Sequence, residues 1–324
     1  MAGVSLALAR LSLALMKSKV SLYIPCYNAE CYIAFTIEGA LRQTYPLDEI
    51  IVVDDASIDH TREIAARYPV RIITHDRNRG TAAARNTGFR SARNELVASL
   101  DADCVAEPDW LEHLVPLLDD PKVGAAGGRV EETHLVSLAD RWRQAHLPLH
   151  WGDKRVVNPP FLFGANGLHR KSVLEKMGGY DEIVWRWRVI NEDGYMSRWV
   201  QEKGYSLVYD PTALVKHIKQ DTVHSVLHNR WRWWRHGVGA YSTRIRLLSI
   251  LATFYRAHFR TMFFEHVRQD ARWGRFELLW LDILCLFYMP YCDLKLYFQA
   301  QGRSNRTGAS AGAQPGPEPD VTGL

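Results

Sequence analysis

Residues 96–103 read LVASLDAD, an apolar run that ends in two aspartates. The run has the composition of a buried β-strand, and similar runs before it are each followed by a helical stretch. Strands are expected at residues 20–24, 50–53, 70–74 and 96–100, and helices at residues 30–42, 61–68 and 81–91. Alternation of strands and helices predicts an α/β, Rossmann-like fold, with a mostly parallel sheet covered by helices on both faces.

Polar residues follow three of these strands, namely Asn28, Asp55 and the pair Asp101 and Asp103. Open α/β sheets bind ligands at the carboxyl ends of their strands, so these side chains are expected around one crevice. Two carboxylates at one strand end suit Mg²⁺ or Mn²⁺ on a diphosphate, although Asp-x-Asp also caps helices. Neither GxGxxG nor GxxxxGK[ST] occurs, which argues against a dinucleotide dehydrogenase and a P-loop nucleotidase.

The composition is that of a globular protein, with 324 residues, 47% of them hydrophobic and 23% charged. A net charge of +4 gives no footprint for nucleic acid, and we expect no nucleic-acid partner. The charge is uneven, because residues 222–280 hold ten Arg and three acidic residues, about +7. The five cysteines form no CxxC pair, so neither a disulfide framework nor a zinc site is indicated, and a cytoplasmic location is expected.

The ends of the chain and its most apolar segment carry little targeting information. Residues 1–17 lack the basic region of a signal peptide, and Met16-Lys17 can serve as the native start. Residues 283–292 are apolar between two aspartates, but ten residues cannot span a bilayer as a helix. No transmembrane helix is predicted.

A series of motifs in order along residues 18–240 strongly resembles glycosyltransferase family 2. The motifs are PCYN at 25–28, VVDDAS at 52–57, NRG at 78–80 with Arg85-Asn86, DAD at 101–103, GGYDE at 178–182 and Glu192-Asp193. The resemblance implies an inverting, nucleotide-sugar-dependent transferase with a GT-A type fold. Four parts are then expected: an extension at 1–17, a GT-A catalytic domain at 18–222, a basic aromatic helical region at 223–300 and a disordered tail at 301–324.

The resemblance also implies roles for the donor-binding residues. Pro25, Tyr27 and Asn28 would line the nucleoside pocket, and Asp55 would contact the base while Asp54 is structural. Arg85 would face the nucleotide or the acidic cluster, and Asp101 would lie near the ribose or sugar. From the residues alone, the Asp54-Asp55 pair could instead cap the helix that follows, a role for which Ser57 and Asp59 are equal candidates.

For the metal and the chemistry, the resemblance implies that Asp103, with Asp101 beside it, holds Mn²⁺ or Mg²⁺ on the diphosphate. His217 would make a further metal or diphosphate contact, and Asn166 would lie beneath the donor sugar and acceptor. Asp193, next to Glu192, would be the catalytic base. From sequence position alone, Glu192-Asp193 could instead stabilise a helix N-terminus.

These roles describe transfer of a sugar, with UDP as the expected nucleotide, to a hydroxyl of a saccharide or lipid-linked glycan, as in polysaccharide biosynthesis. A carboxylate would deprotonate the acceptor while a cation stabilises the leaving diphosphate. The alternative is a non-catalytic protein that binds a nucleotide sugar, or a membrane scaffold that retains the fold. A nucleotidyltransferase is disfavoured because PCYN replaces its Gly-rich basic loop.

Residues 228–236, HNRWRWWRH, allow three interpretations. Arg230-Trp231 matches the end of a Gln-x-x-Arg-Trp signature that holds the polymer in processive family members, but Leu227 replaces the Gln. The others are a segment at an anionic membrane surface and an aromatic helix closing the acceptor site. The helical apolar spacing of 276–297 favours peripheral membrane contact at the inner face, against docking on the catalytic domain or a second subunit of a homo-oligomer.

Overall fold

The computed structural model describes residues 18–180, 192–237 and 264–307. The chain divides into two compact units, residues 1–239 and residues 240–324, which are described separately. Within the described residues, every helix is too short or too polar to cross a bilayer.

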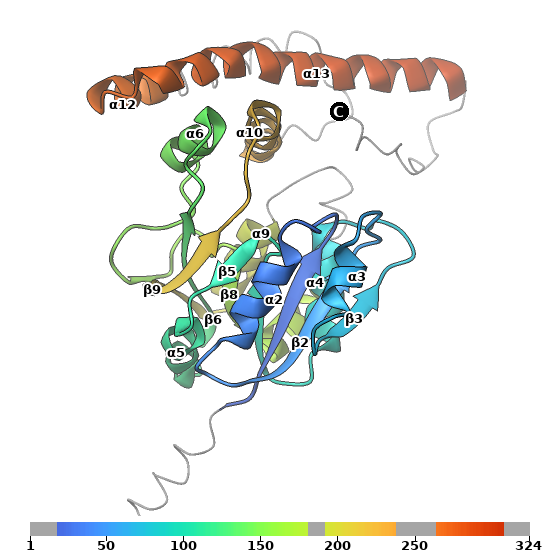
Figure 1. Cartoon of the computed structure of the whole chain (residues 1–324), viewed down its shortest axis with the longest axis vertical. Helices are drawn as coiled ribbons and strands as arrows, with labels where there is room; N and C mark the ends of the chain where they lie inside the picture. The colour runs from blue at the N-terminus through green and yellow to red at the C-terminus, as the bar shows by residue number, and fades with distance from the viewer. Residues whose placement is uncertain (1–17, 181–191, 238–263, 308–324) are drawn as a thin grey trace, which may run out of the picture. The chain divides into compact units, whose positions relative to one another are not determined.

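The first half of unit one is a series of β–α repeats (Figure 1). Its elements are β1 (Val20–Cys26), α2 (Ile33–Leu41), β2 (Leu47–Asp54), α3 (Thr61–Ala65), β3 (Arg71–Thr74), α4 (Thr81–Ser91) and β4 (Leu96–Leu100). β1 pairs in parallel with both β2 and β4, and β2 pairs in parallel with β3. The carboxyl ends of these strands therefore meet at one edge of the sheet.

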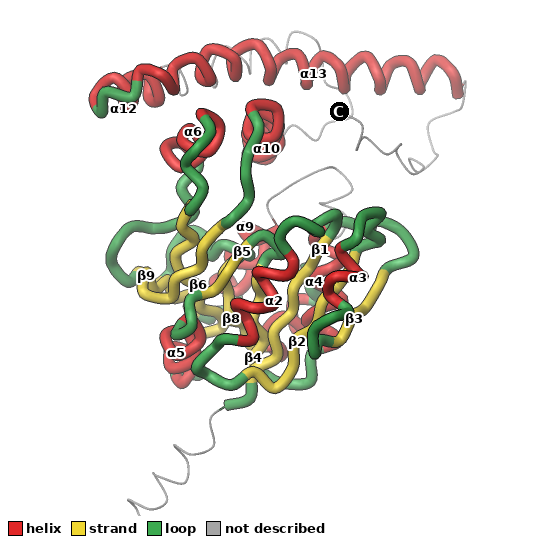
Figure 2. Tube along the Cα trace, in the orientation of Figure 1, coloured by secondary structure: helices red, strands yellow, loops and turns green. Residues whose placement is uncertain are grey.

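The second half of unit one extends the same sheet (Figure 2). Its elements are β5 (Cys104–Ala106), α5 (Trp110–Leu114), the 3₁₀ turn η1 (Val115–Asp119), β6 (Val123–Glu132), α6 (Leu138–His146), β7 (Val156–Val157), β8 (Asn166–Arg170), α7 (Lys171–Met177), α9 (Glu192–Glu202), β9 (Ser206–His217) and α10 (Val223–Gly237). The strand order is β3-β2-β1-β4-β8-β6-β9-β5, with β7 on β9. β8 is antiparallel to β4 and β6, whereas β6 and β9 are parallel.

Each face of the sheet has its own hydrophobic core. Leu22 of β1 packs with Ile33 of α2 and Trp110 of α5, whereas Tyr23 packs on the other side with Phe89 of α4. Successive strand residues point to opposite faces, so a strand covered on both faces is apolar throughout. The predicted α/β fold with helices on both faces is confirmed.

The C-terminal region differs from the predicted division in two details. α10 begins at Val223, where we expected the helical region to begin, but it lies in unit one, where it packs against α6. In unit two, α12 (Val267–Arg272) and the 3₁₀ turn η3 (Phe276–Leu278) precede α13 (Leu279–Thr307). α13 continues beyond residue 301, where we expected a disordered tail, because Gly302 lies inside the helix and does not end it. Residues 238–263 lie outside the described residues.

Candidate active site

The loops after β1 and β2 are joined to each other by Asn28. Its backbone N–H donates to Ser57 Oγ at 3.0 Å, and its Oδ1 accepts from the backbone N–H of Ile58 at 3.0 Å. Asn28 has φ of 50° and Ala56 has φ of 62°, left-handed conformations that Asn tolerates better than most residues. Asn28 is exposed and Tyr27 beside it is half-buried, whereas Pro25 is buried within β1. Asn28 thus fixes the shape of this strand-end loop.

Asp55 is buried and organises the loop that leads into α4. Its carboxylate accepts from the backbone N–H groups of Arg79 and Gly80, at 2.9 Å and 2.6 Å, and lies 2.6 Å from Nδ1 of His75. Gly80 has φ of 92°, which a residue with a Cβ rarely adopts. Asp54 accepts from the backbone N–H of Ser57 at 3.0 Å, which agrees with the structural role expected for it.

Arg85 is the centre of the site. Its side chain is only 3% exposed, with Nη2 3.0 Å from Asp101 Oδ1 and Nη1 2.6 Å from Asp193 Oδ1. It thereby joins α4, the end of β4 and the beginning of α9. Of the two positions expected for Arg85, facing the nucleotide or the acidic cluster, the structure places it against the acidic cluster.

Asp193 is held from a second side by Gly164. The backbone N–H of Gly164 donates to Asp193 Oδ2 at 2.8 Å. A Cβ at residue 164 would lie 2.4 Å from Asp193 Oδ1 and 2.5 Å from Arg85 Cζ, so only glycine fits. The Ser99 hydroxyl in turn donates to the Gly164 carbonyl at 2.8 Å. The resemblance placed Gly164 with Asn166 beneath the donor sugar and acceptor, whereas sequence reasoning did not assign Ser99. The side chain of Glu192 lies outside the described residues.

Asp103 and His217 come together where β5 pairs with the end of β9. The backbone N–H of Ile218 donates to the Asp103 carbonyl at 2.9 Å, and His217 Nε2 lies 3.3 Å from Asp103 Oδ2. Asp103, Cys104 and His217 each have a ligand atom within 4.8 Å of the others. Burial raises the pKa of the Cys104 thiol well above its usual value, which keeps the sulfur protonated. The remaining carboxylate and imidazole donors fit Mn²⁺.

The two aspartates of the strand-end motif have opposite pKa shifts. Burial, with the negative charges of Asp103 and Asp193, raises the pKa of Asp101 against the opposing effect of Arg85. Although burial would raise the pKa of Asp103, the hydrogen bond and charge of His217 lower it below the usual range. A bound cation would relieve the repulsion among these carboxylates.

Asn166 does not have the role that the resemblance implied. It is fully buried, and its Oδ1 accepts from Trp110 Nε1 at 2.7 Å and from the backbone N–H of Gly128 at 3.2 Å. Its Nδ2 donates to the carbonyls of Arg129 and Ala213 at 2.8 Å and 3.0 Å. An amide has two donors and two acceptor positions, so these four bonds use them all. The expected sugar contact is therefore wrong, and Asn166 ties strands to α5.

Arg230 and Trp231 lie on α10, outside the sheet. Trp231 is buried, and its ring centroid is 5.3 Å from that of His228. α10 packs against α6, whose Ser137 N-cap also donates to the Asp221 carbonyl at 3.2 Å. The structure thus groups these residues with α6 and the segment that follows β9.

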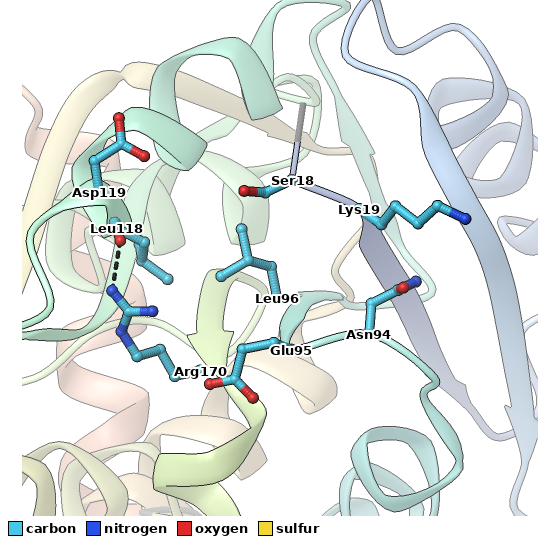
Figure 3. A pocket seen from close by; sticks show the side chains of 8 residues that line it. All are labelled: Ser18, Lys19, Asn94, Glu95, Leu96, Leu118, Asp119 and Arg170. Carbon is cyan, nitrogen blue, oxygen red and sulfur yellow. Dashed lines mark hydrogen bonds between the residues drawn. The ribbon is translucent and has the colours of Figure 1, made fainter. Parts of the chain in front are cut away.

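A cavity of about 290 Å³ lies at the opposite, amino edge of the sheet, where β1 and β4 begin (Figure 3). Arg170 is on its wall, but its guanidinium donates to backbone carbonyls, with Nε 2.9 Å from the Val123 oxygen and Nη2 bonded to the Leu118 oxygen. Its charge is thus used to join β8 to the segment before β6. Because β4 runs from Leu96 towards Asp101, this cavity is at the far end of the strand from the acidic cluster.

Comparison with known proteins identifies the protein family to which the site residues belong. Residues 21–178 match the model of glycosyl transferase family 2. The chain carries a family 2 glycosyltransferase domain. This domain includes β1 to α7 and therefore the Asn28, Asp55, Arg85, Asp101 and Asp103 positions described above.

Two curated relatives extend the similarity beyond the domain. The chain is 27% identical over 266 residues to the probable glycosyltransferase YdaM of Bacillus subtilis, which covers 76% of this chain and 60% of that protein. It is 37% identical over 202 residues to glycosyltransferase AglE of Haloferax volcanii, with 59% of this chain and 64% of that protein covered. The chain thus spans less than two thirds of the length of either relative.

Two solved structures share the fold. The mannosyltransferase PcManGT from Pyrobaculum calidifontis, in complex with GDP-Man and Mn²⁺, superposes with a TM-score of 0.56 at 21% identity, covering 91% of this chain and 88% of that chain. GalNAc-T7 with UDP, GalNAc and Mn²⁺ gives a TM-score of 0.51 at 18% identity, covering 63% and 44%. These similarities confirm the GT-A fold expected from the sequence.

Proposed function

We propose that the protein is an inverting glycosyltransferase that moves a sugar from a nucleoside diphosphate, with UDP as the expected nucleotide, to a hydroxyl of a saccharide or lipid-linked glycan. The observation that carries this proposal is the bridge from Asp101 through Arg85 to Asp193. It joins a carboxylate of the strand-end motif to one that comes from α9. The names of the relatives, and the nucleotides and Mn²⁺ in the titles of the two structures, support the same chemistry.

Asp193 would be the base that removes the acceptor proton, and two contacts that hold its carboxylate support this role. Its two oxygens bond to Arg85 and to the backbone of Gly164, and its side chain remains 25% exposed. Each carboxylate oxygen has two lone-pair positions, so one on each oxygen is available to an acceptor hydroxyl. The two bonds restrict rotation of the carboxylate, which is what a positioned general base requires.

Asp101, Asp103 and His217 would hold the divalent cation, Mn²⁺ or Mg²⁺. When bound, the cation supplies charge stabilisation to the departing diphosphate. Arg85 adds a fixed positive charge beside Asp101. Its guanidinium lies between the carboxylate of Asp101 and that of Asp193, the proposed base. If Asp193 takes the proton of the acceptor hydroxyl while its oxygen attacks the anomeric carbon and the diphosphate leaves, the sugar is transferred in a single displacement with inversion.

Nucleotide binding and transfer should be measured on the same preparations. We expect UDP-sugars with Mn²⁺ to raise the melting temperature of wild type, and Asp193→Asn to keep that shift while losing transfer. Asp59→Asn is a matched control, because it also replaces a hydrogen-bonded carboxylate by an amide. The carboxylate of Asp59 accepts from the backbone N–H groups of Glu30 and Thr61. Stabilisation of wild type without transfer to any acceptor would favour the non-catalytic nucleotide-sugar binder. Normal turnover of Asp193→Asn would exclude Asp193 as the base.

We also propose that unit two contacts an anionic membrane surface from the cytoplasmic side. One stripe of large apolar side chains, 39% to 71% exposed, follows η3 and α13 at helical spacing: Phe276, Trp280, Ile283, Phe287, Tyr291 and Phe298. Arg268 and Arg272 of α12 are also exposed, and Arg275 lies 4.5 Å from the centre of the Trp273 ring. Aromatic and basic side chains together are typical of helices that lie at anionic lipid surfaces.

Flotation with vesicles tests the membrane contact. The full chain should float with phosphatidylglycerol-containing vesicles, and the triple variant Trp280→Ser, Phe287→Ser, Tyr291→Ser should not. Ile58→Ser with Val136→Ser is the control, because both residues are more than 80% exposed in unit one. Equal flotation of the triple variant contradicts the proposal. Loss of a dimer in sedimentation instead would assign the stripe to a second copy of the chain.

A further inference from the structure

A buried carboxylate lies directly behind His217. Glu132 is the last residue of β6, its side chain is 8% exposed, and its Oε2 is 2.8 Å from His217 Nδ1. The two residues are register partners in the parallel pair of β6 and β9. Because an ionised carboxylate only accepts hydrogen bonds, the contact requires a hydrogen on Nδ1. Glu132 therefore determines which nitrogen of His217 is available to other groups.

The other imidazole nitrogen points to the acidic strand end. Nε2 lies 3.3 Å from Asp103 Oδ2, at the position expected to hold the cation, and also 3.3 Å from Arg143 Nη2. A metal-binding histidine commonly donates its second N–H to a carboxylate, which fixes the orientation of the ring and increases the basicity of the ligand atom. Here Glu132 is the carboxylate on the Nδ1 side of His217, and the expected cation position beside Asp103 is on the Nε2 side.

Arg143 of α6 keeps Glu132 in place. Arg143 Nε lies 3.0 Å from Glu132 Oε1, and its Nη1 lies 2.7 Å from Asp221 Oδ2. The guanidinium therefore occupies the oxygen of Glu132 that His217 does not use. It also compensates the charge of the two buried carboxylates, those of Glu132 and Asp221. The first residues of α6 and the segment before α10 are thereby connected to the proposed metal site.

We propose that Glu132 is a positioning residue of the metal site: it holds His217 with Nε2 directed at the cation, and Arg143 holds Glu132. This role rests on the proposed divalent metal but not on sugar transfer. The alternation of β6 is consistent with it, because Glu131 is exposed whereas Glu132 points inward. Glu131 is therefore a matched control for the loss of one carboxylate from the same strand end.

The test measures Mn²⁺ binding and its ligands without turnover. Free Mn²⁺ is titrated by electron paramagnetic resonance with wild type, Glu132→Ala, Glu132→Gln, Glu131→Ala and His217→Ala, alone and with UDP or GDP. Electron spin echo modulation then reports whether an imidazole nitrogen binds the ion. Circular dichroism establishes that each variant is folded, and Glu132→Gln, which keeps the shape of the side chain, decides the outcome if Glu132→Ala does not fold.

We expect Glu132→Ala to weaken Mn²⁺ affinity about 10–100-fold and to reduce the nitrogen modulation, with Glu132→Gln intermediate. Glu131→Ala should match wild type, and His217→Ala should lose the modulation. Equal affinity and modulation in Glu132→Ala and Glu131→Ala would overturn the positioning role alone. Mn²⁺ binding by wild type without nitrogen modulation would overturn it together with the His217 ligand. No Mn²⁺ binding by wild type would overturn the proposed metal site itself.

Discussion

Replacement of Gly164 by alanine tests the geometry that holds Asp193. The added Cβ would lie 2.4 Å from Asp193 Oδ1 and 2.5 Å from Arg85 Cζ. Ordinary contacts of a Cβ begin near 3.4 Å, so the carboxylate or the guanidinium must move by about 1 Å. The carboxylate of Asp193 takes part in both the 2.6 Å contact with Arg85 and the 2.8 Å hydrogen bond from the Gly164 N–H. These two contacts cannot both survive that movement.

The expected effect of Gly164→Ala is on turnover more than on stability. A misplacement of about 1 Å in a reacting group costs roughly 10²-fold in rate, so kcat should fall by at least that factor. Overpacking costs about 1–3 kcal/mol of unfolding free energy, which urea denaturation would measure. Donor affinity should fall less than kcat, because Asp103 and His217 lie on other elements and only Asp101 is bonded to the displaced Arg85.

Gly39→Ala is the matched control for this experiment. Its Cβ would lie 2.9 Å from Val105 Cγ1, so it also overpacks a contact, but one between α2 and β5. Steady-state kinetics and donor titration on both variants separate the two effects. If Gly164→Ala keeps a kcat within threefold of that of Gly39→Ala while both are folded, Asp193 is not the base.

Three further substitutions have distinct expected results. Arg85→Lys cannot reach both Asp101 and Asp193 with a planar fork, so kcat should fall about 10²-fold, and unchanged kcat would show that the bridge is not used. His217→Ala should raise the Mn²⁺ concentration needed for half-maximal transfer, and an unchanged metal titration would exclude His217 as a ligand. Asn166→Ala leaves Trp110 and three backbone groups unbonded, so the unfolding free energy should fall by roughly 3 kcal/mol or more; a smaller loss in urea denaturation would contradict the structural role.

The sheet and the acidic strand ends were predictable because their signals are local. An apolar run followed by polar residues indicates a strand and the edge at which it ends, and Asp101 and Asp103 are found at that edge. The strands after residue 105 were harder to order, since β8 enters antiparallel between β4 and β6. Such an insertion depends on packing between distant segments and not on the pattern within any one of them.

The roles of individual side chains depended on partners far away in the sequence. Asn166 looks like an accessible polar residue after an apolar run, but its partners come from α5, β6 and β9. Glu132 carries no motif, and its importance comes from the register that places it opposite His217. The alternation of β6 could have indicated that Glu132 and not Glu131 points inward, but not what it would meet there.

The charges around the strand ends explain why a divalent cation suits this site better than a further basic side chain. Five carboxylates, those of Asp101, Asp103, Glu132, Asp193 and Asp221, surround two guanidinium groups and one imidazole. Arg85 and Arg143 are each already bonded to two of these carboxylates, and the excess negative charge remains near Asp101, whose pKa is raised by burial and by the charges of Asp103 and Asp193. A third arginine there would compensate the charge but would occupy the oxygens permanently. A dissociable cation compensates the same charge and still coordinates phosphate oxygens, which is the condition for binding and then releasing a nucleoside diphosphate.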